Sequence, residues 1–447
     1  MSGPRDESPQ HELPQNELPQ DALPQDALPQ DALSQDELTQ DELTQDALSR
    51  HEPPPTPARA AERTPEPGPA DAPVRVLWLA KGLGRGGAEQ LLLNCARHAD
   101  RSRYRIEVAY VLPWKDALAP ALTEAGVTVH CLGGVPGTPG RADPRWPLRL
   151  RRLLVERRYH LVHTHMPVPA AAARLLAPTL TGPGPRLVHT EHNVWERYRP
   201  ATRWANALTY RRNDAVIAVS HAVARTVPPG RRRPGDWVTV VHHGPDLSGA
   251  PGGPAARSAA RAELGLPDEA FVVGTVGNLT PKKDQATLLA AHAALLRRHP
   301  RARLVLIGAG PLEGQLRARA AELGIADAVL MTGSRPDVPQ LLPALDVFTL
   351  SSRQEGLPVA LMEAMSSGLP SVVTRVGGMP EVLDDGEQGY LVPPGDPSAL
   401  AEAFARLAEE PDLRTRLAAA ARERSGRFDV AGAQRAVEAV YARVLRH

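Results

Sequence analysis

Aromatic residues are scarce in this chain of 447 residues and make up only 4% of it. Two cysteines, Cys95 and Cys131, provide no disulfide framework, so we expect both to be reduced, buried apolar residues of a cytosolic protein. No apolar run reaches 18 residues, so we expect no transmembrane helix, and the acidic N-terminus is unlike a secretory signal. Leu, Val, Ile and Ala are plentiful, and the length suffices for two or three domains.

The net charge of +1 conceals a strong asymmetry along the chain. Residues 1–72 carry a net charge of −12, residues 73–246 carry +14, and residues 247–447 carry −1. Such a basic region favours anionic partners. Seven arginines within residues 141–158 mark either a solvated helix face or a surface for anionic lipid or acceptor. Nucleic acid is disfavoured as a partner, because no aromatic platform accompanies these arginines.

Residues 1–72 are dominated by a five-residue repeat that begins at Glu12 as ELPQN and ELPQD. Its prolines and polar residues prevent a packed core, so we predict a disordered acidic tail. The tail is either dispensable or a tether or shield for the basic domain.

Strand-like and helix-like segments alternate along the rest of the chain. Seven segments of residues 73–246 and six of residues 268–427 have the apolar pattern of buried strands. This alternation predicts an α/β protein with two doubly wound parallel sheets. We place the domains at residues 73–246 and 247–427, with a linker at residues 248–260. A last helix, over residues 428–447, is expected to pack back on the first domain.

A glycine-rich loop follows the first predicted strand. Gly82, Gly84 and Gly87 fit the pattern G-x-G-x-x-G of dinucleotide-binding loops. The acidic residue expected after the second strand is absent, because residues 112–114 are Leu-Pro-Trp, which argues against an NAD-dependent oxidoreductase. A helix that begins near Gly87 would still direct N–H donors at an anion, although a tight turn without ligand is the alternative.

Polar residues follow four predicted strands of the first domain. In open α/β sheets, ligands bind outside the carboxyl ends of the strands, so these residues predict a functional crevice, although a single such histidine is more often structural. No cluster has the ligand spacing of a closed metal site, so we expect no metal. The residues are His163, Thr164 and His165; Glu191, His192 and Asn193; Ser220 and His221; His242 and His243.

In the second domain, residues 351–374 place Glu355 and Glu363 at a loop-to-helix junction, with Pro358 at the expected start of the helix. N–H groups after Glu355 would be free donors at the positive helix end. Eight residues place the carboxylates up to about 12 Å apart. That is wide for an acid–base pair at one glycosidic bond, typically about 5–9.5 Å, but suits two ends of an extended ligand. Ordinary surface charges are the alternative.

The loop of residues 277–283 lies between a predicted strand and a helix. It brings the amide of Asn278 and the ammonium groups of Lys282 and Lys283 to the start of the helix, which is typical of a phosphate-binding loop. A solvated lysine pair is the alternative interpretation.

Residues 74–445 together resemble the retaining GT-B glycosyltransferases, in particular glycosyltransferase family 4, or glycosyl transferases group 1. The signature E-x7-E is matched by Glu355 and Glu363 within EGLPVALMEAM, and GLPSVVTRVGG and GEQGYLVPPGD match the flanks. GRGGAEQ resembles the family's glycine loop, and HLVHTHMP its strand-end histidine motif. The resemblance implies two Rossmann-like domains that face each other across a cleft.

The resemblance also implies roles for individual residues. Glu363 would bind the donor ribose, and Glu355 with the N–H groups of Gly356 and Leu357 would hold the transferred sugar. Lys283 would neutralise the diphosphate, and His165 would contact the sugar near the reacting carbon. The remaining implied donor contacts are Gly86, Gly87, Asn278 and Arg335. The family often has Arg at Asn278, so Lys283 must carry more of the charge, and often Asn at His243.

The function implied is hexosyl transfer from a nucleoside-diphosphate sugar with retention of configuration, without a cofactor or metal. The acceptor is unknown, and a lipid-linked, anionic or secondary-metabolite acceptor is compatible with the basic first domain. We expect a cytoplasmic location, with peripheral contact at the inner face of the membrane as a further expectation. A non-catalytic sugar-nucleotide-binding protein is the alternative, and an NAD-dependent oxidoreductase is the weaker one.

Overall fold

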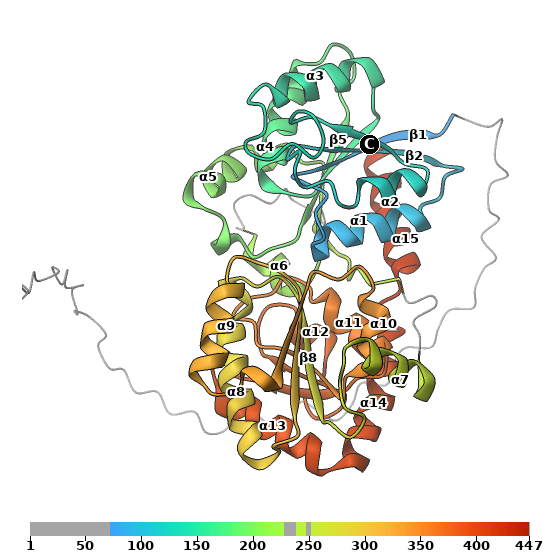
Figure 1. Ribbon diagram of the computed structural model, residues 1–447. Coiled ribbons are helices and arrows are strands. Elements are labelled where there is room, and N and C mark those ends of the chain that lie inside the picture. Colours follow the sequence, from blue (N-terminus) through green and yellow to red (C-terminus); the bar gives the residue numbers. More distant parts are fainter. Residues whose placement is uncertain (1–71, 228–237, 247–251, 447) are drawn as a thin grey trace, which may run out of the picture. The chain divides into compact units, whose positions relative to one another are not determined.

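Figure 1 shows a computed structural model of the chain, which describes residues 72–227, 238–246 and 252–446. The predicted tail lies outside the described residues, apart from residue 72.

The first domain is built on a seven-stranded sheet with the order β3-β2-β1-β4-β5-β6-β7. All neighbouring strands pair in parallel, which confirms the prediction of a parallel sheet. The strands are β1 Val74–Ala80, β2 Tyr104–Tyr110, β3 Thr128–Cys131, β4 Leu161–Thr164, β5 Arg186–Glu191, β6 Ala215–Ala218 and β7 Val238–Val240.

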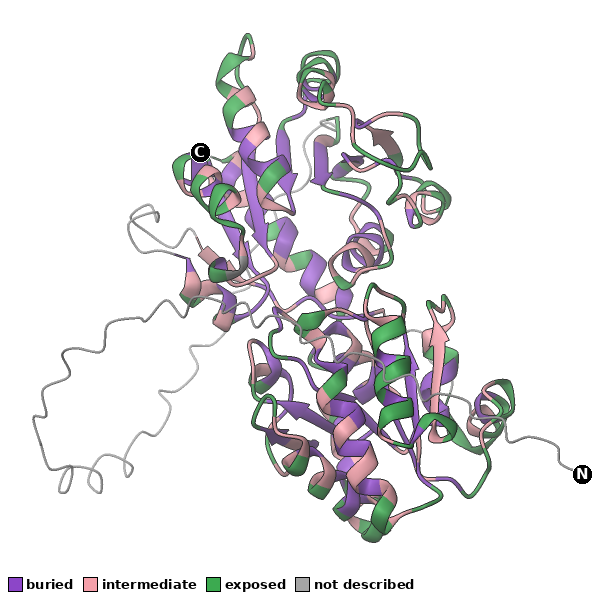
Figure 2. Ribbon diagram, turned by 60° about the vertical axis from the view of Figure 1, so that its left-hand side comes forward, coloured by how far each residue is buried: buried purple, intermediate pink, exposed green. Residues whose placement is uncertain are grey.

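Helices cover both faces of this sheet, and the alternation of side chains along β1 shows why. Val76, Trp78 and Ala80 pack in the cluster that contains α1 and α2, whereas Leu77 and Leu79 pack in the cluster that contains α3 and α4. Strand residues are accordingly buried while outer helix faces are exposed (Figure 2). The helices are α1 Gly87–His98, α2 Ala119–Glu124, α3 Trp146–Arg157, α4 Pro167–Leu176, α5 Pro200–Thr209 and α6 His221–Thr226.

The second domain repeats the architecture with a six-stranded parallel sheet of order β10-β9-β8-β11-β12-β13. Its strands are β8 Val272–Val276, β9 Arg303–Ile307, β10 Val329–Gly333, β11 Val347–Leu350, β12 Ser371–Thr374 and β13 Gly389–Val392. Its helices are α8 Gln285–Arg298, α9 Glu313–Glu322, α10 Val338–Leu341, α11 Val359–Ser366, α12 Met379–Val382, α13 Pro397–Glu409 and α14 Pro411–Ser425. The predicted α/β class with two Rossmann-like domains is therefore confirmed.

The predicted linker at residues 248–260 is wrong for its described part, because a helix, α7 Gly253–Glu263, occupies it. Pro254 lies in the first turn, where its missing N–H costs no hydrogen bond, and alanines favour the helix interior. Arg257 and Arg261 anchor the helix on Asp346, at 2.7 and 2.8 Å. This tertiary ion-pair partner lies 85 residues beyond Arg261, so local composition could not reveal it.

The last helix, α15 Val430–Leu445, packs on the first domain beside α1 (Figure 1). Tyr441 fixes it to the first sheet, because Trp78 Nε1 donates a 2.9 Å hydrogen bond to Tyr441 Oη. Tyr441 Oη in turn lies 2.6 Å from His163 Nδ1, so its own proton goes to that nitrogen. Asp429 is the N-cap residue of the helix, and its carboxylate accepts hydrogen bonds from the N–H groups of Ala431 and Gly432.

Replacing Tyr441 with Phe should lower the free energy of unfolding by about 2 kcal/mol, because it leaves two buried polar groups unpaired. Tyr104→Phe is the matched control, since that hydroxyl is also buried at α15 but makes only a 3.3 Å bond to the carbonyl of Glu438. Denaturant unfolding of both variants measures the difference, and equal losses would contradict the role of the Tyr441 hydroxyl.

Within the part of the chain that the structure describes, no helix combines the length and the apolar character that crossing a membrane requires.

Candidate active site

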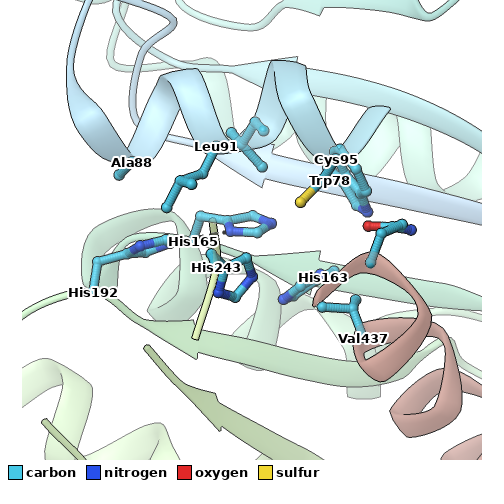
Figure 3. A pocket seen from close by; sticks show the side chains of 11 residues that line it. Trp78, Ala88, Leu91, Cys95, His163, His165, His192, His243 and Val437 are labelled. Carbon is cyan, nitrogen blue, oxygen red and sulfur yellow. Dashed lines mark hydrogen bonds between the residues drawn. The ribbon is translucent and has the colours of Figure 1, made fainter. Parts of the chain in front are cut away.

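Strand-end residues of the first domain surround a small hollow between α1, α15 and the edge of the sheet (Figure 3). Figure 3 shows the rings of His163, His165, His192 and His243 gathered on one side, and Leu91 and Cys95 of α1 on the other. The predicted gathering of strand-end histidines is thus present in the structure.

These histidines have different functions in the fold. His163 is fully hydrogen-bonded, with Nε2 2.7 Å from the hydroxyl of Thr190, and it therefore has a structural role. His165 lies with Nδ1 3.3 Å from Nε2 of His192, while its own Nε2 is buried without a hydrogen-bond partner among the described residues. Burial, reinforced by neighbouring histidines, lowers the pKa of His192 to about 3 and holds that of His165 well below its usual value. Both rings are therefore neutral at physiological pH.

Glu191, another strand-end residue, has a structural role. It is fully buried and accepts hydrogen bonds from Trp195 Nε1 at 3.1 Å and from the hydroxyl of Tyr198 at 2.6 Å. Burial opposes its charge, but His189 and these hydrogen bonds prevail, so its pKa falls to about 2. The carboxylate therefore anchors the loop that follows His192.

In the second domain, Lys283 and Glu355 form an ion pair. Lys283 Nζ lies 2.5 Å from Glu355 Oε1, which also accepts a 2.6 Å hydrogen bond from the hydroxyl of Ser352. The hydroxyl of Ser351 lies 3.0 Å from the backbone carbonyl oxygens of both Lys283 and Asp284, and so fixes the segment that carries Lys283. The strand ends of β8 and β11 thus place an ammonium group and a carboxylate at one point.

Free donors lie directly beside this pair. Among the described residues, the backbone N–H groups of Gly356 and Leu357 have no hydrogen-bond partner, as predicted for the start of a helix. The helix begins at Val359, one residue later than predicted, so Pro358 is its N-cap residue and not its first helical residue. Two N–H donors and the positive end of α11 together form a site for an oxygen-rich or anionic group.

Gly356 is also one of the points where the two domains touch. A side chain there would come within 2.1 Å of the carbonyl oxygen of His192, so only glycine fits. The carbonyl of Gly356 accepts hydrogen bonds from Ser220 Oγ at 3.2 Å and from the N–H of Gly378 at 3.1 Å. The loop of Glu355 therefore lies against the histidine-rich strand ends of the first domain.

Glu363 lies one helical turn into α11, and its carboxylate has no hydrogen bond or ion pair within the described part of the chain. Burial raises its pKa to about 7. A partly buried carboxylate without a partner is costly in a protein, and its oxygens are free to accept hydrogen bonds.

Two glycines of the glycine-rich loop are packed against charged side chains of the chain itself. A side chain at Gly82 would come within 2.8 Å of Lys115 Cβ, and one at Gly86 within 2.3 Å of Glu89 Oε2. Both glycines therefore make room for charged side chains of this chain. Gly86 is the N-cap of α1, and a side chain at Gly87 would lie 3.8 Å from Val359, so the starts of α1 and α11 are adjacent.

Two further predicted residues lie at the edge of this region. Asn278 is exposed, and its backbone carbonyl accepts a 3.2 Å hydrogen bond from Gln285 Nε2. Arg335 follows β10, where its guanidinium is held by Asp337 and Glu263 at 2.6 and 2.9 Å. Nothing in the structure tests their contact with a donor, so both remain predictions, as do the roles of the other site residues.

The sequence predicted His192 as one of the strand-end residues but gave it no individual role, and it did not single out Ser352. His192 contacts both His165 and the loop of Glu355, and Ser352 shares Glu355 with Lys283. The position of His192 directly after a strand was a usable signal, whereas the contact of Ser352 depends on how the loop folds.

Two known protein families match most of the chain in sequence. Residues 85–248 match the family described as Glycosyltransferase Family 4, and residues 256–424 match the family described as Glycosyl transferases group 1. A crystal structure of Anabaena HepE superposes with a TM-score of 0.72 at 23% identity, covering 83% of this chain and 99% of that one. The fold is therefore that of the GT-B glycosyltransferases.

Two curated relatives illustrate the similarity in sequence. The D-inositol 3-phosphate glycosyltransferase of Saccharomonospora viridis is 39% identical over 204 residues, which cover 43% of this chain and 47% of the relative. The protein of the same description from Corynebacterium urealyticum is 31% identical over 291 residues, covering 60% of this chain and 68% of the relative. The chain belongs to glycosyltransferase family 4, the glycosyl transferases group 1.

Proposed function

We propose that the chain transfers a hexosyl group from a nucleoside-diphosphate sugar to an acceptor, with retention of the anomeric configuration. One observation carries the proposal: the Lys283–Glu355 pair and two N–H donors lie at the start of helix α11, and Glu363 lies one turn further on, with no partner for these donors or for Glu363 among the described residues. The ammonium group of Lys283 suits a diphosphate. Glu355 and the neighbouring N–H donors suit a sugar, and the carboxylate of Glu363 suits the hydroxyl groups of a ribose. The related HepE was crystallised in complex with UDP and glucose, which supports a nucleotide donor.

In this assignment the pair of Lys283 and Glu355 is the resting state of the donor site. The entering diphosphate takes the ammonium group of Lys283 as its counter-charge, and Glu355 accepts hydrogen bonds from sugar hydroxyl groups. Glu363, at the other end of the donor, accepts hydrogen bonds from the ribose hydroxyl groups. Gly86, Gly87, Asn278 and Arg335 remain further proposed donor contacts.

Transfer breaks the bond between the anomeric carbon and the β-phosphate oxygen, and forms a bond between that carbon and the acceptor oxygen. The acceptor hydroxyl gives its proton to the departing phosphate oxygen, so both events take place on one face of the sugar. Lys283 and the N–H groups at α11 stabilise the charge that develops on the leaving group. His165 and His192, both neutral, offer ring nitrogens to the sugar and its acceptor.

This scheme assigns the neutralisation of the diphosphate to Lys283 alone, without a metal ion. Donor turnover should therefore be unchanged when the enzyme is assayed with EDTA and without added Mg²⁺. Loss of turnover in EDTA that Mg²⁺ restores would contradict this assignment.

Thermal unfolding with UDP-glucose, GDP-glucose, ADP-glucose and NAD tests the donor class. A ligand at about one hundred times its Kd should stabilise the folded chain by about 2.7 kcal/mol. We expect at least one sugar nucleotide to shift the transition and NAD not to shift it. A shift with NAD alone would favour the oxidoreductase. Release of nucleoside diphosphate, followed by mass spectrometry, separates catalysis from binding, and its absence across acceptors would favour a binding protein.

A further inference from the structure

Lysine is rare in this arginine-rich chain. Of 52 basic residues, four are lysines and 48 are arginines. All four lysines lie in three loops at the carboxyl ends of strands: Lys81 after β1, Lys115 after β2, and Lys282 and Lys283 after β8. Lysine is a compact point charge and arginine a planar fork, so the two are not interchangeable at a binding site. All four ammonium groups therefore lie at the edge of the sheets where ligands bind in open α/β folds.

Lys81 and Lys115 belong to two loops that are joined by hydrogen bonds. The carbonyl of Lys81 accepts from the N–H groups of Val111 and Leu112, at 3.2 and 2.8 Å. The carbonyl of Lys115 accepts from the N–H of Leu83, and the stem of Lys115 runs over Gly82. Both lysine side chains are exposed, and neither has a carboxylate within ion-pair distance among the residues that the structure describes.

Glu89 connects these lysines with the second domain. Its carboxylate lies at the position that a side chain of Gly86 would take, at the start of α1. Lys115 from the first domain and Lys282 from the second both act on it electrostatically. Two ammonium groups, one from each domain, therefore act on a single carboxylate near the start of α11.

We propose that Lys81 and Lys115 bind a phosphate group carried by the acceptor, at a site distinct from the diphosphate site at Lys283. The proposal rests on the proposed function, which it deepens by naming the class of acceptor. Two exposed ammonium groups on adjoining loops, with no carboxylate at ion-pair distance among the described residues, suit a dianion, and ammonium–phosphate contacts are strong hydrogen bonds. The acceptor hydroxyl would then be presented beside Gly86 and Gly87, between the phosphate and the sugar donor.

Because the chain has only four lysines, chemical acetylation followed by mass spectrometry reads each amine separately. The full chain is first saturated with UDP, and inorganic phosphate or chloride is then added at equal ionic strength. We expect UDP to slow the acetylation of Lys283, and phosphate to slow that of Lys81 and Lys115 by about tenfold further. Lys115→Ala should remove the protection of Lys81.

Arg97→Ala is the matched control, because it removes one exposed positive charge at the other end of α1, about 15 Å from its start. This variant should keep full protection by phosphate. Equal rates in phosphate and chloride, or protection that persists in Lys115→Ala, would overturn the proposal. Failure of UDP to protect Lys283 would instead count against the donor site, so the two proposals fail separately.

The phosphate could belong to a soluble metabolite or to a lipid. Glycerol 3-phosphate is therefore compared with vesicles of phosphatidylcholine that contain phosphatidic acid, with UDP bound in both cases. Protection of Lys81 and Lys115 by one of them supports the proposal and identifies the source. Protection by inorganic phosphate alone, with neither ester effective, would reveal an adventitious ion only and would overturn the proposal.

Discussion

Lys283→Ala is expected to lower kcat/KM for the sugar nucleotide by about 2–4 kcal/mol of transition-state stabilisation, or about 30- to 1,000-fold. Lys283 is the ammonium group nearest to Glu355 and the free N–H donors of α11, so the substitution leaves the departing diphosphate without its direct counter-charge. Asn278 brings no charge that could replace it. Steady-state kinetics with the preferred donor measure the effect.

Arg97→Ala again provides the control, since a general effect of net charge would appear in both variants. Turnover of Lys283→Ala within a few-fold of the unsubstituted chain would contradict the assigned role. A loss of activity that accompanies unfolding would be uninformative about catalysis, so thermal unfolding of both variants is measured in parallel. Lys283 ends a short 3-10 helix, Pro281–Lys283, and pairs with the buried Glu355, so the kinetics are measured below the unfolding transition of the variant.

Glu363→Gln should have opposite effects on stability and on donor binding. Burial raises the pKa of Glu363 from its usual 4.5 to about 7, so between these values the folded chain binds more protons than the unfolded chain. Stability therefore falls as the pH rises through this range, and the cost is complete above about pH 7. The difference corresponds to at most about 3 kcal/mol, because the side chain is partly exposed.

Glutamine has nearly the same shape and no charge, so the substitution removes this cost. Denaturant unfolding at pH 8 should show a gain of up to about 3 kcal/mol, and at pH 5.5 about half of that. For the unsubstituted chain, kcat/KM for the donor should rise as the pH rises through about 7, because the carboxylate is the stronger acceptor for ribose hydroxyls. In Glu363→Gln this pH dependence should disappear and donor affinity should fall. A variant that keeps normal donor affinity would show that Glu363 does not bind the ribose.

Much of the fold followed from local patterns. Apolar runs such as residues 74–80 predicted the strands of both sheets, because strands buried on both faces must be apolar throughout. Helix α7 was missed because its stability depends on Asp346, which is remote in sequence. The pattern of glycines predicted a loop open to ligand, but two glycines accommodate Lys115 and Glu89, which the spacing could not reveal.

Local patterns in the sequence also located the residues of the site, but they could not predict the contacts between these residues. The positions of Lys283, Glu355 and Glu363 at strand and helix ends could be read from the chain, but the contact between the first two depends on how two strands, β8 and β11, lie side by side. The histidines were expected at one edge, whereas the structural role of His163 depends on Tyr441 of the last helix; His165 keeps an Nε2 without a partner among the described residues. Contacts of that kind join residues hundreds of positions apart.

The most direct test of retaining sugar transfer is the anomeric configuration of the first product, followed by proton NMR with the preferred sugar nucleotide. With an α-linked donor, the account predicts that the donor is consumed and that the new anomeric signal is that of the α-linked product, before any mutarotation. A β-linked product would contradict the retaining mechanism. A donor that remains intact with every acceptor, including phosphorylated ones, would contradict the assignment of the Lys283, Glu355 and Glu363 site to sugar transfer.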